Sequence, residues 1–321
     1  MEYTGLILKY KLNRSLSEQE RADRLKPKQR FDVEPLYDLQ IIRMNSTFLE
    51  TCDKYYGWKG FLTWVTLLCS AILIGALVAI EAIFFIIKWE EIYKARGTET
   101  YVSAILIALI IAPVLALSIW ALLKDAFTYT HYPIRFNRKT RMVHVFRPGG
   151  KILSVPWDTV FFTVRSFRSS GFENQEIVGH ILADDGVTIT DTFPLGVIMA
   201  DDDVRKHWEY IRRYMEDGPQ ELLVKTYCYL PIAFRKETYL FGLRRLFEIL
   251  PGVVVVWVIG FPLFFVHSLG RWIAMQTSKI PQWPAEIEAE CRIEPGDLYE
   301  RDERHNVTRP WQIFDTVDTR K

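Results

Sequence analysis

The chain has 321 residues, of which 49% are hydrophobic and 25% charged, which is long enough for a membrane part plus one soluble domain. Forty Lys and Arg stand against thirty-nine Asp and Glu, and the formal charge of +1 excludes a global bias toward nucleic acid or an acidic substrate. The four cysteines show no CxxC spacing, so free thiols are expected in place of a zinc site or disulfides; they are Cys52, Cys69, Cys228 and Cys291.

Residues 1–57 are predicted to form a mixed-charge, cytoplasmic N-terminal tail with some local structure. Ser17-Glu-Gln-Glu20 is a capping-box pattern for a helix that must stop before Pro27, and residues 6–12 suit a short strand. Because the first 58 residues are polar and charged, no cleavable signal peptide is expected, and the first apolar run would direct insertion itself.

Two apolar runs, residues 61–87 and 101–123, occupy most of the region 58–124. Each exceeds the roughly 20 apolar residues that a helix needs to cross a hydrocarbon core of about 30 Å, and only a short link joins them. They therefore predict a transmembrane helical hairpin, kinked at Pro113. The first helix has a possible packing face of small residues, Ser70, Gly75 and Ala79. Aromatic or basic anchor residues lie near the ends of both helices: Trp58, Trp64, Lys88, Trp89, Tyr101 and Trp120.

Glu81 is the one ionisable residue inside either run, which makes it a candidate intramembrane polar site. It lies about six residues from the end of the first run, within reach of interfacial water or Lys88. A structural or interfacial role is therefore preferred to ion handling.

After Asp125 the hydrophobic period changes from helical to alternating, which predicts an antiparallel β module over residues 125–220. Asp184-Asp-Gly186 is a strong hairpin signal between two of the strands. Asp201-Asp-Asp203 then caps an amphipathic helix that ends before Gly218-Pro219, and capping explains these carboxylates better than a metal site does. The predicted strands are 132–136, 142–147, 151–155, 159–166, 176–183 and 187–193, with a further one at 195–199; the apolar helix positions are Val204, Trp208, Ile211 and Met215.

A run of strands closed by one helix resembles the pleckstrin-homology superfold, as a β-barrel or sandwich. Phe136-Asn-Arg-Lys-Thr-Arg-Met-Val-His-Val-Phe146, Gly150-Lys-Ile and Val155-Pro-Trp-Asp158 resemble the opening strands of bacterial membrane-tethered versions. The whole chain, with its Asn13-Arg-Ser-Leu-Ser-Glu opening, resembles bacterial inner-membrane proteins of unassigned function. Members are often encoded beside Rhs-type or other type VI secretion toxins. The resemblance implies an immunity protein whose partner is the cognate secreted toxin, in an α+β membrane fold.

Residues 135–168 contain eight basic residues and one acidic residue, Asp158. A basic face directly after a membrane span would suit anionic headgroups or a protein partner, at about 1 kcal/mol per residue for lipid. An ordinary solvated strand edge has the same composition. The candidate surface consists of Arg135, Arg138, Lys139, Arg141, Arg147, Lys151, Arg165 and Arg168.

No histidine lies in a metal-ligand or catalytic pattern, and the chain has no GxSxG or phosphate-binding glycine loop. We therefore expect no enzyme activity, no metal and no cofactor. The histidines are His131, His144, His180, His207, His267 and His305.

Residues 221–248 are predicted as a juxtamembrane segment that brings Arg244 and Arg245 to a third apolar run at 249–270. This run is long enough to span, but Pro251, Gly260 and Pro262 interrupt it, so a re-entrant segment stays open. The C-terminal tail, 271–321, is net acidic, and tryptophans give it anchors for packing.

Basic residues near the spans favour a multi-pass inner-membrane protein with its N-terminus and β module in the cytoplasm. The alternatives to immunity are a membrane-tethered lipid-binding or signalling module and a channel or transporter component. Membrane lipids are expected partners in each case. The sequence predicts no oligomeric state.

Overall fold

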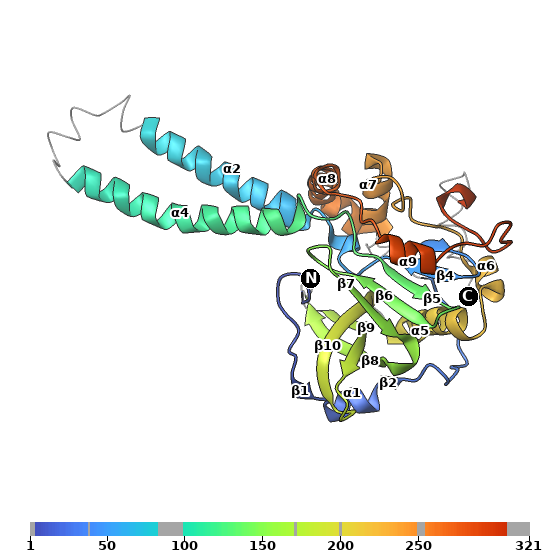
Figure 1. Ribbon diagram of the computed structural model, residues 1–321. Coiled ribbons are helices and arrows are strands. Elements are labelled where there is room, and N and C mark those ends of the chain that lie inside the picture. The colour runs from blue at the N-terminus through green and yellow to red at the C-terminus, as the bar shows by residue number, and fades with distance from the viewer. Residues whose placement is uncertain are drawn as a thin grey trace. The chain divides into compact units, whose positions relative to one another are not determined.

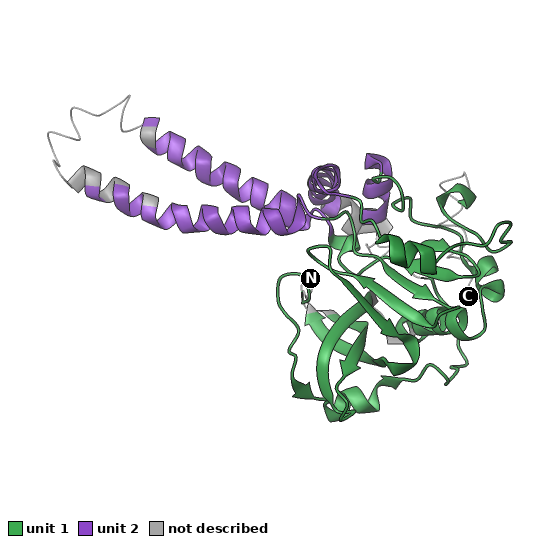
Figure 2. Ribbon diagram, viewed as in Figure 1, with its two compact units in different colours: residues 1–58, 129–237, 280–321 green, residues 59–128, 238–279 purple. Residues whose placement is uncertain are grey.

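The computed structural model of the chain describes residues 4–37, 39–82, 99–169, 172–198, 201–248 and 254–306. The chain forms two compact units, each built from segments that are far apart in the sequence (Figure 2). Unit 1 comprises Met1–Trp58, Tyr129–Glu237 and Ile280–Lys321, and unit 2 comprises Lys59–Thr128 and Thr238–Lys279.

Unit 1 contains two five-stranded antiparallel sheets (Figure 1). Their strand orders are β1-β10-β9-β8-β2 and β3-β4-β5-β6-β7. Among the described residues the two sheets share no strand, so the expected barrel does not close; unit 1 is an α+β unit with two sheets. The strands are β1 (Arg14–Ser15), β2 (Arg24–Leu25), β3 (Ile41–Met44), β4 (Phe48–Thr51), β5 (Ile134–Asn137), β6 (Met142–Phe146), β7 (Ile152–Pro156), β8 (Phe161–Ser169), β9 (Phe172–Leu182) and β10 (Thr188–Ile198).

The N-terminal residues are part of this unit, which differs from the separate tail expected for 1–57. β1 and β2 form the two edges of the first sheet, and β4 pairs with β5 in the second. Between β1 and β2 lies helix α1 (Glu18–Ala22), whose predicted capping box is confirmed: Ser17 Oγ accepts from the Glu20 amide at 3.2 Å. The strand predicted at 6–12 is wrong, because this stretch makes only an isolated bridge from Leu8 to Thr4.

The hairpin predicted at Asp184-Asp-Gly186 is confirmed and joins β9 to β10. The Asp185 carboxylate accepts hydrogen bonds from the Val187 and Thr188 amides, each at 2.8 Å, and Gly186 has a φ of +66°. The further strand predicted from residue 195 is the end of β10, which continues past a register shift after Pro194.

Helix α5 (Asp201–Glu216) packs against β9 and β10, and its predicted apolar positions are buried. Trp208 stacks on Trp157 at 5.5 Å between ring centroids, and both lie against Phe162. The same core cluster contains Phe136 from the second sheet and Phe193 from the first, so the core of unit 1 receives side chains from both sheets and the helix.

The C-terminal residues up to 306 also belong to unit 1, through helix α9 (Ala285–Glu290). Trp283, Ile287 and Cys291 form a buried cluster with Phe48 and Phe146. The expectation of packing anchors therefore holds at Trp283, whereas Trp311 lies outside the described residues. Unit 1 also has α6 (Gln220–Lys225) and the short 3-10 helices Tyr56–Trp58, Trp157–Thr159 and Glu303–His305.

Unit 2 consists of helices, among them α2 (Phe61–Ala82) and α4 (Glu99–Asp125), which pack against each other as a hairpin. Helices α7 (Tyr239–Glu248) and α8 (Val254–Thr277) pack together, and α8 also contacts α2. Two stretches are long and apolar enough to cross a membrane by length and composition, Tyr56–Ile80 and Ile105–Asp125. Both α4 and α8 continue through their internal prolines, Pro113 and Pro262.

The base of the hairpin is held by buried polar groups. The Asp125 carboxylate, at the end of α4, accepts hydrogen bonds from the Gly60 amide at 3.0 Å and the Thr63 amide at 2.9 Å, at the start of α2. The Lys59 ammonium donates to the Asp125 carbonyl and, at 3.1 Å, to Thr128 Oγ1. Gly75 belongs to the predicted small-residue packing face, but a side chain at this position would contact none of the described residues, so Gly75 does not allow a close helix contact here.

Candidate binding pocket

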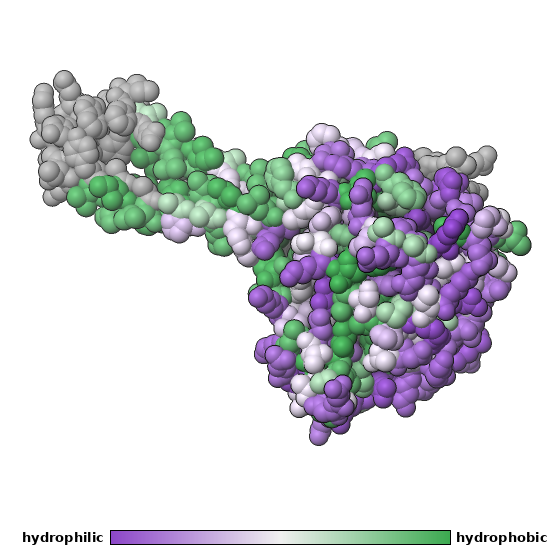
Figure 3. All heavy atoms as spheres, viewed as in Figure 1, coloured by the Kyte–Doolittle hydropathy of each residue, from purple (hydrophilic) through white to green (hydrophobic). Residues whose placement is uncertain are grey.

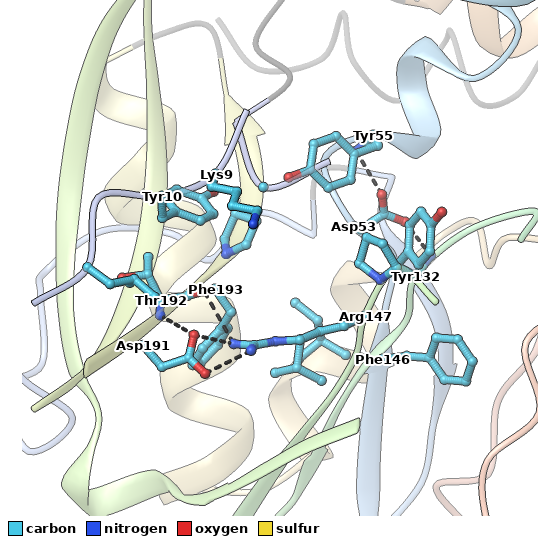
Figure 4. Close-up of a pocket in the computed structure, with 16 residues that line it drawn as sticks. Lys9, Tyr10, Asp53, Tyr55, Tyr132, Phe146, Arg147, Asp191, Thr192 and Phe193 are labelled. Carbon is cyan, nitrogen blue, oxygen red and sulfur yellow. Dashed lines mark hydrogen bonds and ion pairs between the residues drawn. The ribbon is translucent and has the colours of Figure 1, made fainter. Parts of the chain in front are cut away.

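A half-open pocket of about 240 Å³ lies in unit 1, with walls from both sheets (Figure 4). Ile134 of β5 and Val145 of β6 come from the second sheet, and residues 191–194 of β10 come from the first. The N-terminal residues 5–12 and the loop after β4 supply the other walls. The pocket therefore depends on the N-terminal segment that folds into this unit.

An ion pair between the sheets closes one side of the pocket. The Arg147 guanidinium, directly after β6, donates to both oxygens of Asp191 on β10, at 2.8 and 2.9 Å, and also to the Thr192 carbonyl at 3.3 Å. The side chains are 27% and 31% exposed, and the pair is bidentate. The two charges neutralise each other, so neither provides an unpaired charge for a ligand.

Asp53 has a structural role on the opposite wall. One carboxylate oxygen accepts from the Tyr132 amide at 2.7 Å, and the other accepts from the Tyr55 amide at 2.8 Å. Since both oxygens are occupied by backbone donors, this buried acid positions the two tyrosines.

Aromatic residues contribute to the remaining wall, among them Tyr10, Tyr55 and Tyr132, which are labelled in Figure 4. The Tyr55 and Tyr132 rings meet edge to face at 6.3 Å between centroids. Burial raises the pKa of the Tyr55 phenol well above its usual range, and the neutral hydroxyl donates to the Thr4 carbonyl at 2.5 Å. This bond holds the N-terminal segment against the pocket.

Next to the pocket is a buried ionic cluster. The Lys54 ammonium lies 2.7 Å from the Glu176 carboxylate, with both side chains almost fully buried, and Arg165 pairs with the same carboxylate. Lys54 also donates to the Tyr10 hydroxyl at 3.3 Å and lies over the Tyr10 and Tyr55 rings. The cluster therefore fixes the rings that line the pocket.

The predicted basic surface does not form one exposed face. Arg135 is fully buried between the Phe48 and Trp283 rings, and it pairs with Glu50 at 3.0 Å and Glu288 at 3.1 Å, so its assignment to a surface is wrong. Four more of the eight residues pair with carboxylates: Lys139 with Glu294, Arg141 with Asp158 and Glu216, Arg147 with Asp191, and Arg165 with Glu176. Arg138 is half-buried, and Lys151 and Arg168 are exposed.

The other candidate, Glu81, belongs to the last turn of α2, and its side chain lies outside the described residues. Within the part of the chain that the structure describes, no group of three or more His, Cys, Asp or Glu could hold a metal ion.

Sequence reasoning missed the residues that build the pocket, which include Lys9, Asp53 and Asp191. They come from distant positions and carry no short motif, so only the pairing of the N-terminal segment with the β module brings them together.

The model of a family of unknown function, DUF6708, matches residues 110–295, which is more than half of the chain. No curated protein and no solved structure matches the sequence. The matched range begins within α4 and includes strands β5 to β10 and helices α5 to α9, whereas β1 to β4 and α2 lie before it. The chain therefore belongs to the DUF6708 family, whose function is unknown.

Proposed function

We propose that this protein is an inner-membrane immunity protein. Unit 2 anchors it in the bilayer through the α2–α4 hairpin, and unit 1, on the cytoplasmic side, neutralises a type VI secretion toxin by binding it directly. No chemistry by this chain is needed, since an immunity protein requires a surface that fits its toxin and a location where the toxin acts.

The exposed apolar surface of the hairpin carries the anchoring part of the proposal. Ile72 and Val78 on α2 are 62% and 58% exposed, and Leu109 and Ile110 on α4 are 65% and 67% exposed. Figure 3 displays hydrophobic residues along both helices. In water this surface would be costly, at about 25 cal/mol per Å², whereas hydrocarbon covers it without cost.

The binding part rests on two observations. Unit 1 has a pocket with mostly apolar walls, and the charged pairs at this pocket, Lys54 with Glu176 and Arg147 with Asp191, are balanced internally, so the pocket suits binding and has no evident chemistry. The resemblance to proteins encoded beside type VI toxins supplies the class of partner.

Co-expression with the toxin encoded beside this gene tests the proposal. Cells that make both proteins should grow, and the two should co-purify from solubilised membranes. Glu81→Gln should keep rescue, because recognition is not ion handling.

A double variant, Ile72→Lys with Leu109→Lys, places charges on the lipid-facing surface and should lose both membrane insertion and rescue. If the neighbouring gene encodes no toxin, or if rescue fails although the wild-type protein is inserted, the immunity proposal is wrong. A membrane-tethered lipid-binding or signalling module is then the better account.

A further inference from the structure

The pocket in unit 1 has one charge that its own residues do not balance. Arg147 is paired with Asp191, and Asp53 is saturated by two backbone amides. Lys9 lines the same pocket and is exposed, and none of the described carboxylates lies within ion-pair distance of its ammonium group. The pocket thus presents a single unpaired cation beside walls that are mostly aliphatic and aromatic.

The rim of the pocket is also apolar where a partner would meet it. Leu12 lines the pocket and is 40% exposed, and Leu8, one residue before Lys9, is 62% exposed. A partner side chain that enters the pocket would bring its neighbouring residues into contact with these two leucines at the rim.

The size of the pocket decides between classes of occupant. Sites for drug-sized ligands and cofactors usually measure about 300–1,000 Å³, and this pocket has about 240 Å³. A pocket of this size suits one large side chain better than a whole cofactor or lipid chain. The unbalanced Lys9 cation favours an acidic residue next to that side chain.

From these observations we infer that the pocket is the anchor site for a partner polypeptide. It takes one aromatic or long aliphatic side chain, and Lys9 pairs with an acidic residue beside it. The inference rests on the proposed function, since the partner is then the toxin, but the pocket can be tested without the toxin.

The test uses the full chain in detergent micelles and three variants on the same segment. Lys9→Glu reverses the unbalanced charge, and Leu12→Arg places a charge in the apolar mouth. Lys11→Glu is the matched control, because Lys11 is equally an exposed lysine and does not line the pocket. All of these positions are on the surface, and thermal unfolding verifies that each variant folds.

Toxin affinity is measured first, by interferometry. The Kd should rise at least tenfold for Lys9→Glu and Leu12→Arg and less than twofold for Lys11→Glu. If both pocket variants bind the toxin as tightly as the wild-type chain, the inference about the pocket is overturned while the immunity proposal stands.

The second arm uses three short peptides and saturation-transfer NMR. The sequences are Ser-Gly-Phe-Asp-Ser-Gly, the same peptide with Asn for Asp, and the same peptide with Gly for Phe. Only the first should bind well, and Lys9→Glu should abolish its preference over the Asn peptide. If the wild-type chain does not bind the toxin, this arm still decides the matter. Equal binding of all three peptides, or tighter binding of dodecanoate than of the first peptide, overturns the inference.

Discussion

Two buried histidines make unit 1 sensitive to acid. His207 on α5 is 1% exposed, and burial lowers its pKa to about 4, although a contact with the Leu36 carbonyl opposes this. His180 on β9 is 3% exposed, and burial likewise lowers its pKa to about 4, against the effect of Glu20 at 3.3 Å. Both imidazoles are therefore neutral in the folded unit at pH values where an unfolded chain protonates them.

The sign of the effect follows from linkage. An unfolded histidine has a pKa of about 6.5, so between pH 6.5 and 4 the unfolded state binds more protons than the folded state. The free energy of unfolding therefore decreases as the pH is lowered through this range. Each histidine removes up to about 1.4 kcal/mol of unfolding free energy per pH unit in this range. Urea unfolding followed by tryptophan fluorescence, in detergent at pH 7.5, 6.0 and 5.0, should show the loss.

His207→Gln keeps a hydrogen-bond donor for Leu36 and removes the titration, so its stability should depend less on pH across the same range. An unchanged pH dependence in this variant would rule out His207 as a source of the acid sensitivity.

The carboxylates affect the stability of unit 1 at lower pH than the histidines do. Burial alone would raise the pKa of Glu50, but Arg135 and Arg43 outweigh it and hold that pKa at about 2. Since the folded pKa lies below the unfolded value, the stability contributed by Glu50 is lost only as pH falls below about 4.5.

Arg135 also shows what a local charge count misses. Residues 135–168 are strongly basic in the sequence, yet the carboxylates that pair with them stand at positions such as Asp191, Glu216 and Glu288. Alternation along a strand predicts which residues face inward only if the strand's neighbours are known. Here β4 and α9 bury a position that the β module alone would expose.

At the scale of elements, the short-range signals were the reliable ones. The capping box at Ser17, the turn at Asp184-Asp-Gly186 and the 3.6-residue period of α5 each depend on neighbouring residues alone, and each is confirmed. The strands contributed by the N-terminal segment were not predictable in the same way. β1 and β2 have only two residues each, and their partners lie more than a hundred residues away.

The start of α2 depends on one glycine. Gly60 has a φ of +89°, and a side chain there would overlap the backbone of Arg271 on α8. Gly60→Ala should therefore lower the free energy of unfolding of unit 2 by at least about 2 kcal/mol, as measured by thermal unfolding in detergent.

Gly75→Ala is the matched control, because Gly75 is helical and its position is open. This substitution should leave the stability unchanged or raise it slightly, since Ala favours a helix over Gly by about 0.5–1 kcal/mol. Equal melting temperatures for Gly60→Ala and the wild-type chain would contradict the close approach of α2 and α8.

At the scale of the whole molecule, the apolar runs correctly predicted a pair of long apolar helices, but the rest of the chain was predicted as too many separate regions. Residues 1–57, the β module and the C-terminal residues were expected as three regions, and they form one unit. The pocket was invisible in the sequence for the same reason, because its walls are brought together only by this long-range assembly. Whether residues 249–270 span the membrane stays a prediction, since 249–253 lie outside the described residues.

In the proposed function, unit 1 meets the toxin on the cytoplasmic side, and the α2–α4 hairpin crosses the bilayer twice. Reporter fusions after Arg30, Ala95 and His180 test this arrangement most directly. A cytoplasmic reporter should be active after Arg30 and His180, and a periplasmic reporter should be active only after Ala95. Periplasmic activity after His180, or cytoplasmic activity at all three positions, would contradict a hairpin anchor with unit 1 inside the cell.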